Sequence, residues 1–327
     1  MRKVTIEDIS QRTGLSRGTV SRALNDRPDI SQKTKHRVLE ACRELNYVPN
    51  HAARSLATGR NYAVAVLLDD LTSVFAASYL RGVIRAAEEA AYAVQALEIG
   101  SGGETTRDRI RALSAVRIDS LLIGCPIARE IAPLLLDVIR NRVTASCFPV
   151  EGLAGDVFTP DFVEAGRVVG RVLLSSGASN LLYVHRPDTP GAPERLTGFQ
   201  DVFRSQNLDP EGCIVRLDGG GVAAVGERLA AASAIGCSDD FVAIEVMFEC
   251  HRRGRLPGRD VTVIGQGNER VGARISPSLT SLDFAGEEIG RRSFETAHQR
   301  IMQQRQDAPQ HARIAPTLIR RASSGGY

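Results

Sequence analysis

Residues 5–25, TIEDISQRTGLSRGTVSRALN, constrain the fold of the N-terminal part more than any other segment. Thr5 with Asp8 three residues later forms the pattern of a capping box, which starts a helix. Gly14 follows as a typical helix stop. The pattern therefore predicts a short amphipathic helix that ends in a tight turn.

A second helix is predicted over residues 17–24, directly after Ser16, which can cap it. Val20 and Leu24 lie four residues apart, so they face the first helix. The outer side is polar or basic and comprises Arg17, Gly18, Ser21 and Arg22, with Thr19 at its rim. Such a helix can place its first turn in the major groove of DNA. The alternative is a small helical hairpin with a solvated basic face, because this pattern has many false positives.

A third helix is predicted from Ser31 over SQKTKHRVLEACRELN. Its apolar stripe comprises Val38, Leu39, Cys42 and Leu45. The segment that follows, NHAARSLATGRN, is cationic and too short to form a stable helix alone in water. It therefore needs a partner, such as a DNA groove or a second copy of itself.

Charge is unevenly distributed along the chain. Residues 1–60 contain 12 Lys and Arg against 6 Asp and Glu, a net +6, so the rest carries −3 of the total of +3. Positive charge concentrated at one end indicates a polyanionic partner.

From Tyr62 onward, short apolar runs alternate with helical patterns. The predicted strands are 63–68, 93–97, 120–124, 144–148, 180–185, 213–217 and 261–265. The predicted helices are 78–91, 105–115, 129–141, 162–176, 193–206 and 239–253. This alternation is typical of parallel sheets covered by helices on both faces.

Several classes of protein and site are not indicated by the sequence. The sequence contains no run of 18 apolar residues, so no membrane span is predicted. The N-terminus lacks the apolar stretch of a signal peptide, so we expect a cytoplasmic protein. The six cysteines have no metal-ligand spacing and are expected to be reduced, so no metal or cofactor is predicted. The sequence lacks four common catalytic or nucleotide-binding motifs: a P-loop, GxSxG, GxGxxG after a strand, and HExxH. The Gly-rich stretch at 218–222 is not followed by GK[ST], so it is not a P-loop. No enzyme is therefore predicted.

The elements TVSR, LNYVPN and ARSLA fall at fixed spacing within the first sixty residues. There the chain resembles the headpiece and hinge of the lactose-repressor/galactose-repressor (LacI/GalR) family. Residues 62–322 resemble, more loosely, the periplasmic-binding-protein-like core of the same family. The resemblance implies an all-α helix-turn-helix headpiece plus an α/β core of two parallel-sheet subdomains.

The resemblance also implies domain boundaries. The headpiece is expected at 1–48, the hinge helix or linker at 49–61, the core at 62–322 and a frayed tail at 323–327. The expected crossings between subdomains lie near 160, 284 and 316. The N-subdomain would then comprise about 62–159 and 285–315, and the C-subdomain about 160–283 and 316–322. A ligand would lie in the cleft between them, where the strands have their carboxyl ends.

The family resemblance assigns DNA contacts residue by residue. Base edges are expected to be read by Arg17, Gly18 and Arg22, although Gly18 has no side chain with which to read a base. Phosphate contact or turn geometry is expected of Thr5, Ser16, Thr19, Ser21 and Asn25. In the hinge helix, residues 50–58, DNA contacts are expected from Asn50, Ala53 and Leu56. Leu56 would be wedged into the minor groove at the operator centre, and its alternative is a core leucine.

Effector contacts are expected from Phe75, Asp161, Arg195, Asp239 and Asn268. Four of them have an ordinary alternative. Phe75 could be a core phenylalanine and Asp161 a structural hinge. Arg195 could form a surface ion pair, and Asp239 could cap a helix. In sugar-binding relatives an acidic residue follows the strand at 261–265 by two positions, whereas Gly267 and then Asn268 stand here. An anionic ligand held by Arg195 therefore fits better than a neutral hexose, and the alternative is a cleft without a ligand.

The expected function is a sequence-specific DNA-binding transcriptional regulator, in particular a repressor. It would bind a palindromic operator as a homodimer, or as a tetramer, under the control of a sugar or sugar-derived effector, with no membrane partner. The alternatives are a sugar kinase or other α/β enzyme with a fused DNA-binding segment, and a solute-binding protein for transport.

Overall fold

The computed structural model describes residues 4–24, 29–45, 47, 59–100, 103–139, 142–217 and 221–325. They fall into two compact units, on either side of the bond between Asn61 and Tyr62. Each unit has a hydrophobic core of its own.

The N-terminal unit contains three helices, α1 (Ile6–Thr13), α2 (Arg17–Leu24) and α3 (Gln32–Glu44). Thr5 precedes α1 and donates hydrogen bonds from its backbone N–H and its hydroxyl to the Asp8 carboxylate, each at 2.8 Å. Gly14 ends α1 in the left-handed conformation, with φ +65°. The two predicted helices and the turn between them are therefore confirmed.

The core of this unit corrects one detail of the predicted third helix. Ile9, Val20 and Val38 are fully buried, one from each helix. Leu39, which was expected on the apolar stripe, is 48% exposed, whereas Ala41 is buried. Leu39 is turned about 100° around the helix from Val38, and the small Ala41 suits the close crossing with the other helices.

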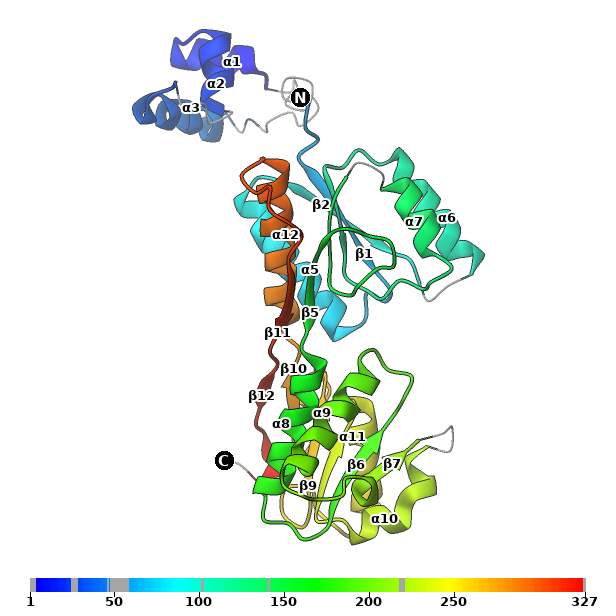
Figure 1. The fold of residues 1–327 in the computed structure, drawn as a ribbon. Coiled ribbons are helices and arrows are strands. Elements are labelled where there is room, and N and C mark those ends of the chain that lie inside the picture. Colours follow the sequence, from blue (N-terminus) through cyan, green and yellow to red (C-terminus); the bar gives the residue numbers. More distant parts are fainter. Residues whose placement is uncertain are drawn as a thin grey trace. The chain divides into compact units, whose positions relative to one another are not determined.

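The C-terminal unit contains two six-stranded sheets (Figure 1). The first has the order β11-β5-β4-β3-β1-β2, and all of its strands are parallel. Its strands are β1 (Ala63–Leu68), β2 (Ala93–Glu98), β3 (Ser120–Ile123), β4 (Val143–Ser146), β5 (Asp156–Pro160) and β11 (His311–Ile314). The second has the order β12-β10-β9-β8-β6-β7 and is parallel except for β12. Its strands are β6 (Leu181–His185), β7 (Ile214–Arg216), β8 (Ala234–Cys237), β9 (Thr262–Gln266), β10 (Thr280–Asp283) and β12 (Thr317–Ile319).

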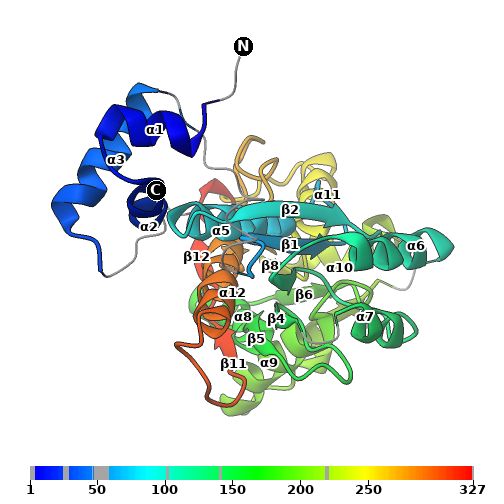
Figure 2. The same ribbon diagram turned by 90° about the horizontal axis from the view of Figure 1, so that it is seen from above.

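Helices cover both faces of each sheet. On the first sheet, α5 (Val74–Glu89) and α12 (Gly286–Ile301) cover one face (Figures 1 and 2). The other face is covered by α6 (Glu104–Ala112) and α7 (Ala132–Val138). The second carries α8 (Phe162–Ser175) and α9 (Ala192–Ser205) against one core, and α10 (Gly226–Ala231) and α11 (Asp240–Arg252) against the other. Along β1, Val64, Val66 and Leu68 pack against α5 and α12, whereas the alternate residues pack toward α6 and α7. Both faces of this strand are buried, which explains its continuous apolar sequence.

Two pairs of helices cross at glycines. A Cβ atom built on Gly82 of α5 would lie 1.9 Å from the carbonyl oxygen of Glu287 in α12. A Cβ atom on Gly166 of α8 would lie 1.8 Å from the carbonyl oxygen of Arg195 in α9. The two helix backbones are therefore in contact at each crossing, and a side chain at either glycine would push them apart.

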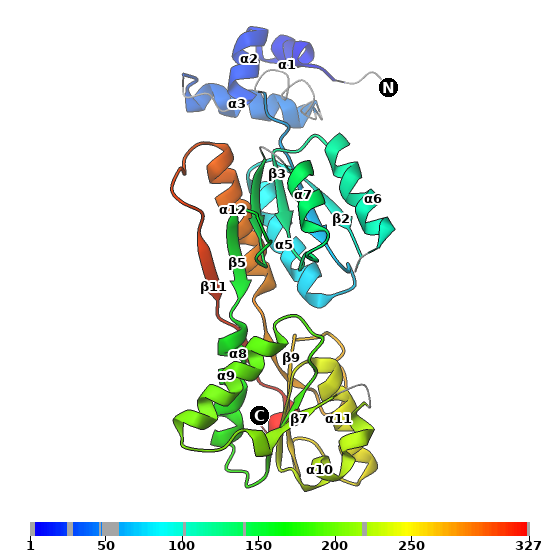
Figure 3. The same ribbon diagram turned by 45° about the vertical axis from the view of Figure 1, so that its right-hand side comes forward.

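The chain passes from one sheet to the other after β5, after β10 and after β11, and β5 and β11 lie side by side (Figure 3). Ser323, the first residue of the tail that was expected to fray, is held in place. Ser323 is fully buried, and its hydroxyl donates to the carbonyl of Val263 at 2.6 Å and accepts from the N–H of Thr280 at 2.9 Å. These two hydrogen bonds hold the tail against the second sheet. Within the described residues, no helix has the length and apolar character needed to cross a membrane.

Candidate functional site

The outer face of α2 is polar and basic. Arg17, Gly18 and Arg22 are exposed, while Thr19 and Ser21 are partly buried. The opposite face carries the buried Val20 and Ala23. The helix start is ordered by Ser16, whose hydroxyl accepts from the N–H of Thr19 at 3.1 Å. The structure thus places all these predicted residues on or beside one face, as a helix that enters a groove requires.

The two arginines of this face are held by weak, solvent-exposed ion pairs. Arg17 Nε lies 3.1 Å from Glu7 Oε2, and Arg22 Nη1 lies 3.2 Å from Asp29 Oδ2. Exposed pairs of this kind contribute about 0–1 kcal/mol. Both guanidinium groups can therefore exchange a carboxylate for phosphate oxygens or for guanine O6 and N7 at small cost.

Gly18 is not required by packing. A Cβ atom there would meet only Ser16 Oγ, at 3.8 Å, and its φ is in the ordinary helical range. The missing side chain therefore allows close approach of the helix to another surface. Thr5 is exposed at the start of α1. The predicted contacts Asn25, Asn50, Ala53 and Leu56, with the hinge helix, lie outside the described residues.

A cavity of about 230 Å³ lies at the carboxyl ends of the strands of both sheets. Asp69 directly follows β1, Phe148 follows β4, and Phe284 follows β10. Five phenylalanines line the cavity: Phe75, Phe148, Phe162, Phe241 and Phe284. Six charged residues line it as well: Asp69, Asp239, Asp240, Glu269, Arg186 and Arg195. This location is where open parallel sheets bind ligands.

Arg195 is 3% exposed and is held from several sides. Its guanidinium donates to the Pro190 carbonyl at 2.9 Å and to Thr189 Oγ1 at 2.6 Å. It also lies 5.3 Å from the ring centre of Phe162 and 5.6 Å from that of Phe284. Burial lowers the pKa of Arg195 from its usual value. Its Nε has no hydrogen-bond partner within the described part of the chain.

Carboxylates gather on the side of the cavity formed by α11 and the loop after β9. Asp239 caps α11 by accepting from the N–H of Val242 at 2.8 Å. Asp240 is 1% exposed and accepts from Ser281 Oγ and from the N–H of Glu269, each at 2.6 Å. Burial raises the pKa of Asp240 to about 6. Burial and the neighbouring Asp240 and Asp239 raise the pKa of Glu269.

The cavity brings together three of the five predicted effector residues. Phe75, Arg195 and Asp239 line it. Asp161 does not, because its carboxylate caps α8 by accepting from the N–H of Glu164 at 2.9 Å. Asn268 does not line it either, because its side-chain amide donates to Asp283 Oδ2 at 2.8 Å and its oxygen accepts from Arg321. Both side chains are taken up by hydrogen bonds near points where the chain changes sheet.

Other lining residues were missed from the sequence. Asp69, Gln266 and Glu269 follow or end predicted strands, and that position is a usable signal in parallel sheets. Phe284 had no such signal, because the strand before it was not predicted. No set of three or more His, Cys, Asp or Glu within the described ranges is arranged to hold a metal ion.

Comparison with known protein families finds two matches along the chain. Residues 5–50 match the family of bacterial regulatory proteins of the lacI type, and residues 171–324 match a periplasmic binding protein-like domain. The chain is 25% identical over 312 residues to the HTH-type transcriptional repressor PurR of Vibrio campbellii, covering 91% of this chain and 92% of that protein. It is 27% identical over 309 residues to PurR of Vibrio atlanticus, with 91% and 92% covered.

Solved structures show the same fold. The lac repressor dimer bound to operator and the anti-inducer ONPF has a TM-score of 0.73 at 20% identity, and 99% of each chain is covered. The transcriptional regulator CelR in complex with cellobiose has a TM-score of 0.69 at 23% identity, covering 98% of this chain and 100% of that one. The chain thus joins a lacI-type DNA-binding domain to a periplasmic-binding-protein-like domain, and it is similar over most of its length to transcriptional repressors.

Proposed function

We propose that this protein is a cytoplasmic, nucleoid-associated repressor that binds a palindromic operator and is released from it, or recruited to it, by a small-molecule effector. Its activity is binding rather than catalysis. The observation that carries the proposal is the exposed face of α2, where Arg17 and Arg22 form exposed ion pairs with Glu7 and Asp29. Side chains so placed can read base edges in the major groove.

The operator-bound form is proposed to be a homodimer, or a tetramer built from two dimers. A palindromic site matches a protein with two-fold symmetry. The similar lac repressor structure is a dimer bound to operator. On α11, Phe241 and Phe248 are 55% and 63% exposed and lie two turns apart, which suits an apolar contact with a second copy.

The effector is proposed to act from the cavity between the two sheets. Phe75 of α5 and Phe284, just before α12, both line this cavity. These two helices pack directly on each other at Gly82. A ligand that alters the distance between the sheets would therefore move the α5–α12 pair, and coupling of about 1–3 kcal/mol would change DNA affinity about 5- to 150-fold.

Selection of binding sites from a randomised duplex library, using the full chain, tests the proposal. We expect the recovered sequences to share an inverted repeat. Enrichment should be lost in a variant with Arg17→Ala and Arg22→Ala, and kept in the control Arg129→Ala, whose side chain is 85% exposed in the C-terminal unit. Recovery of unrelated sequences by the unaltered chain would contradict the proposal.

A further inference from the structure

The cavity is lined by more acidic than basic side chains. Four carboxylates line it, from Asp69, Asp239, Asp240 and Glu269, against two guanidinium groups. At pH 7.5, which is above the raised pKa of about 6 of Asp240, this buried carboxyl group is mostly ionised and adds negative charge to the lining. A ligand that fills this space must therefore supply donors or positive charge to balance it.

Both guanidinium groups already have partners in the protein, although Arg195 Nε has none within the described residues. Arg195 donates to Thr189 and Pro190 and packs on two phenyl rings. Arg186 lies between two carboxylates, with Nε 3.8 Å from Asp239 and Nη2 3.9 Å from Glu245. To bind Arg186, an anionic ligand would have to compete with Asp239 and Glu245. It would also come close to the other acidic side chains of the lining. The anionic effector suggested by Arg195 alone is therefore disfavoured by the complete lining.

Gln266 supplies an independent indication of a ligand donor. It lines the cavity and is 2% exposed. Its Nε2 donates to the carbonyl of Cys237 at 2.9 Å, and because a carbonyl can only accept, this bond fixes the orientation of the amide. The other end, Oε1, has no hydrogen-bond partner among the described residues. A buried carbonyl oxygen without a partner costs free energy, which a ligand N–H would recover.

The aromatic part of the lining also suits a cation. Phe162 and Phe284 already hold the guanidinium of Arg195 against their rings. Phe75 and Phe148 lie beside them, with ring centres 6.4 Å apart in an edge-to-face arrangement. The faces of aromatic rings attract cations, and several rings around one site form a cage for ammonium groups.

We propose that the effector is a small organic cation, with an ammonium group that donates to Gln266 Oε1 and to the carboxylates of Asp239 and Glu269, and with its carbon skeleton against the phenylalanines. This inference rests on the proposed function, because it assumes that the cavity is the effector site. It assigns the charge of the ligand and the residues that select it.

Three probes that share one ring and differ in charge test the proposal: benzylamine, benzyl alcohol and benzoate. Their dissociation constants for the full chain are measured by ligand-observed NMR at pH 7.5 and constant ionic strength. We expect benzylamine, protonated at this pH, to bind at least about tenfold more tightly than either of the others. Equal binding of the three, preference for benzoate, or no saturable binding of benzylamine would overturn the proposal.

Two neutralising variants locate the selectivity. Glu269→Gln and Asp239→Asn keep the side-chain shape, and each should weaken benzylamine about 5- to 10-fold while changing benzyl alcohol less than twofold. The control Glu227→Gln, at an exposed position of α10 outside the lining, should change neither. Unaltered benzylamine affinity in both lining variants would contradict the assignment.

Operator binding by the same preparations separates the two proposals. Sequence-specific DNA binding together with preference for benzoate would remove only the cationic effector. Loss of any sequence preference for DNA would remove the proposed function, whatever the cavity binds.

Discussion

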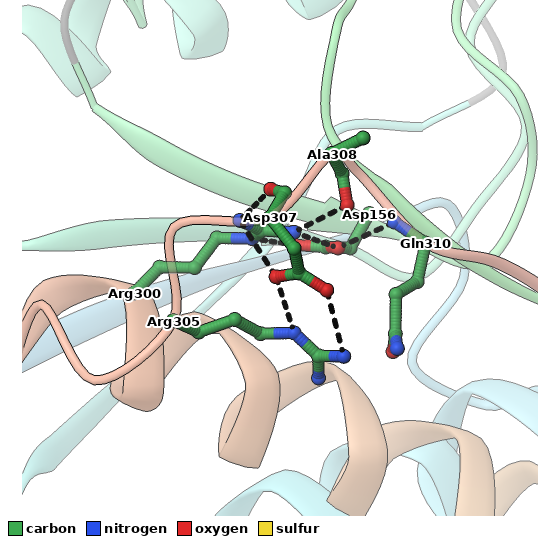
Figure 4. Close-up of polar contacts among 6 residues, drawn as sticks. All are labelled: Asp156, Arg300, Arg305, Asp307, Ala308 and Gln310. Carbon is green, nitrogen blue, oxygen red and sulfur yellow. Dashed lines mark hydrogen bonds and ion pairs between the residues drawn. The ribbon is translucent and has the colours of Figure 1, made fainter.

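Asp156 at the start of β5 provides a quantitative test of how the first sheet is closed. Its carboxylate is 1% exposed and accepts hydrogen bonds from Arg300 Nε at 2.6 Å, Arg300 Nη2 at 2.8 Å and the N–H of Gln310 at 2.8 Å (Figure 4). Arg300 lies at the end of α12, and Gln310 directly precedes β11. One carboxylate thus joins β5, α12 and the loop that leads from α12 to β11.

The expected cost of Asp156→Ala follows from these contacts. Removing one partner of a buried ion pair costs about 3–5 kcal/mol, because the other charge is left without compensation. The Arg300 side chain is 16% exposed and keeps the carbonyls of Asp307 and Ala308 as acceptors. We therefore expect a loss near the lower limit, about 3 kcal/mol in the free energy of unfolding of the C-terminal unit.

Urea denaturation of the full chain, followed by circular dichroism, measures this loss. Asp307→Asn is the matched control, since Asp307 belongs to the same cluster but its side chain is 54% exposed, and it should cost less than about 1 kcal/mol. The double variant Asp156→Leu/Arg300→Met should recover most of the stability, because both charges are removed together. A loss below 1 kcal/mol for Asp156→Ala would refute this reasoning. So would a double variant whose loss of unfolding free energy equals the sum of the losses of the two single variants.

Three further predictions concern single side chains. Arg22→Ala should weaken operator binding by about 1–3 kcal/mol and relax base preference in fluorescence anisotropy, so unchanged selectivity would count against its role. Gly18→Ala should stabilise α2 by up to about 1 kcal/mol in thermal unfolding while altering the preferred operator, and an unaltered preference would separate this position from the DNA. The pKa of Asp240 is about 6 in the folded state against the usual 3.8, so the folded state binds this proton more tightly than the unfolded state. The resulting contribution to the free energy of unfolding is fully present below about pH 4 and is lost as the pH rises through 6. The loss is at most about 3 kcal/mol. Asp240→Asn should abolish this decline relative to the unaltered chain, and parallel stability–pH curves for the two would contradict it.

The N-terminal helices could be predicted almost to the residue because their signals are local. Thr5 and Asp8 start α1, Gly14 ends it, and Ser16 starts α2. The exposure of Leu39 could not be predicted, because it depends on how three helices cross and not on the sequence of one. A pattern of apolar residues gives the side of a helix only to within about one position.

In the C-terminal unit, the sequence predicted seven of the twelve described strands, most of them at apolar runs, but it missed the short apolar run AIGC of β8. The run at 63–68 is β1 with the same bounds. The strands β5, β8, β10, β11 and β12 and the helices α10 and α12 were missed. Of these, β11 carries the exposed His311 at the edge of its sheet, and β10 has the sequence TSLD, so neither shows an apolar run. Edge strands and short polar strands are specified by their neighbours more than by their own residues.

The ligand site shows the same limit. Arg195 and Asp239 could be found through family resemblance, but the charge balance of the cavity could not. Asp69 and Glu269 meet there only because the two sheets present their carboxyl ends to one space. From that balance we propose a cationic ligand, whereas Arg195 in isolation suggested an anionic one.

The central claim is that the exposed face of α2 reads a symmetric DNA sequence. The most direct measurement is the ratio of dissociation constants, at one fixed salt concentration, for a selected inverted repeat and for a duplex of the same bases in shuffled order. The account predicts at least about 10³-fold tighter binding to the inverted repeat, with two chains on each duplex. Equal affinity for the two duplexes would contradict it.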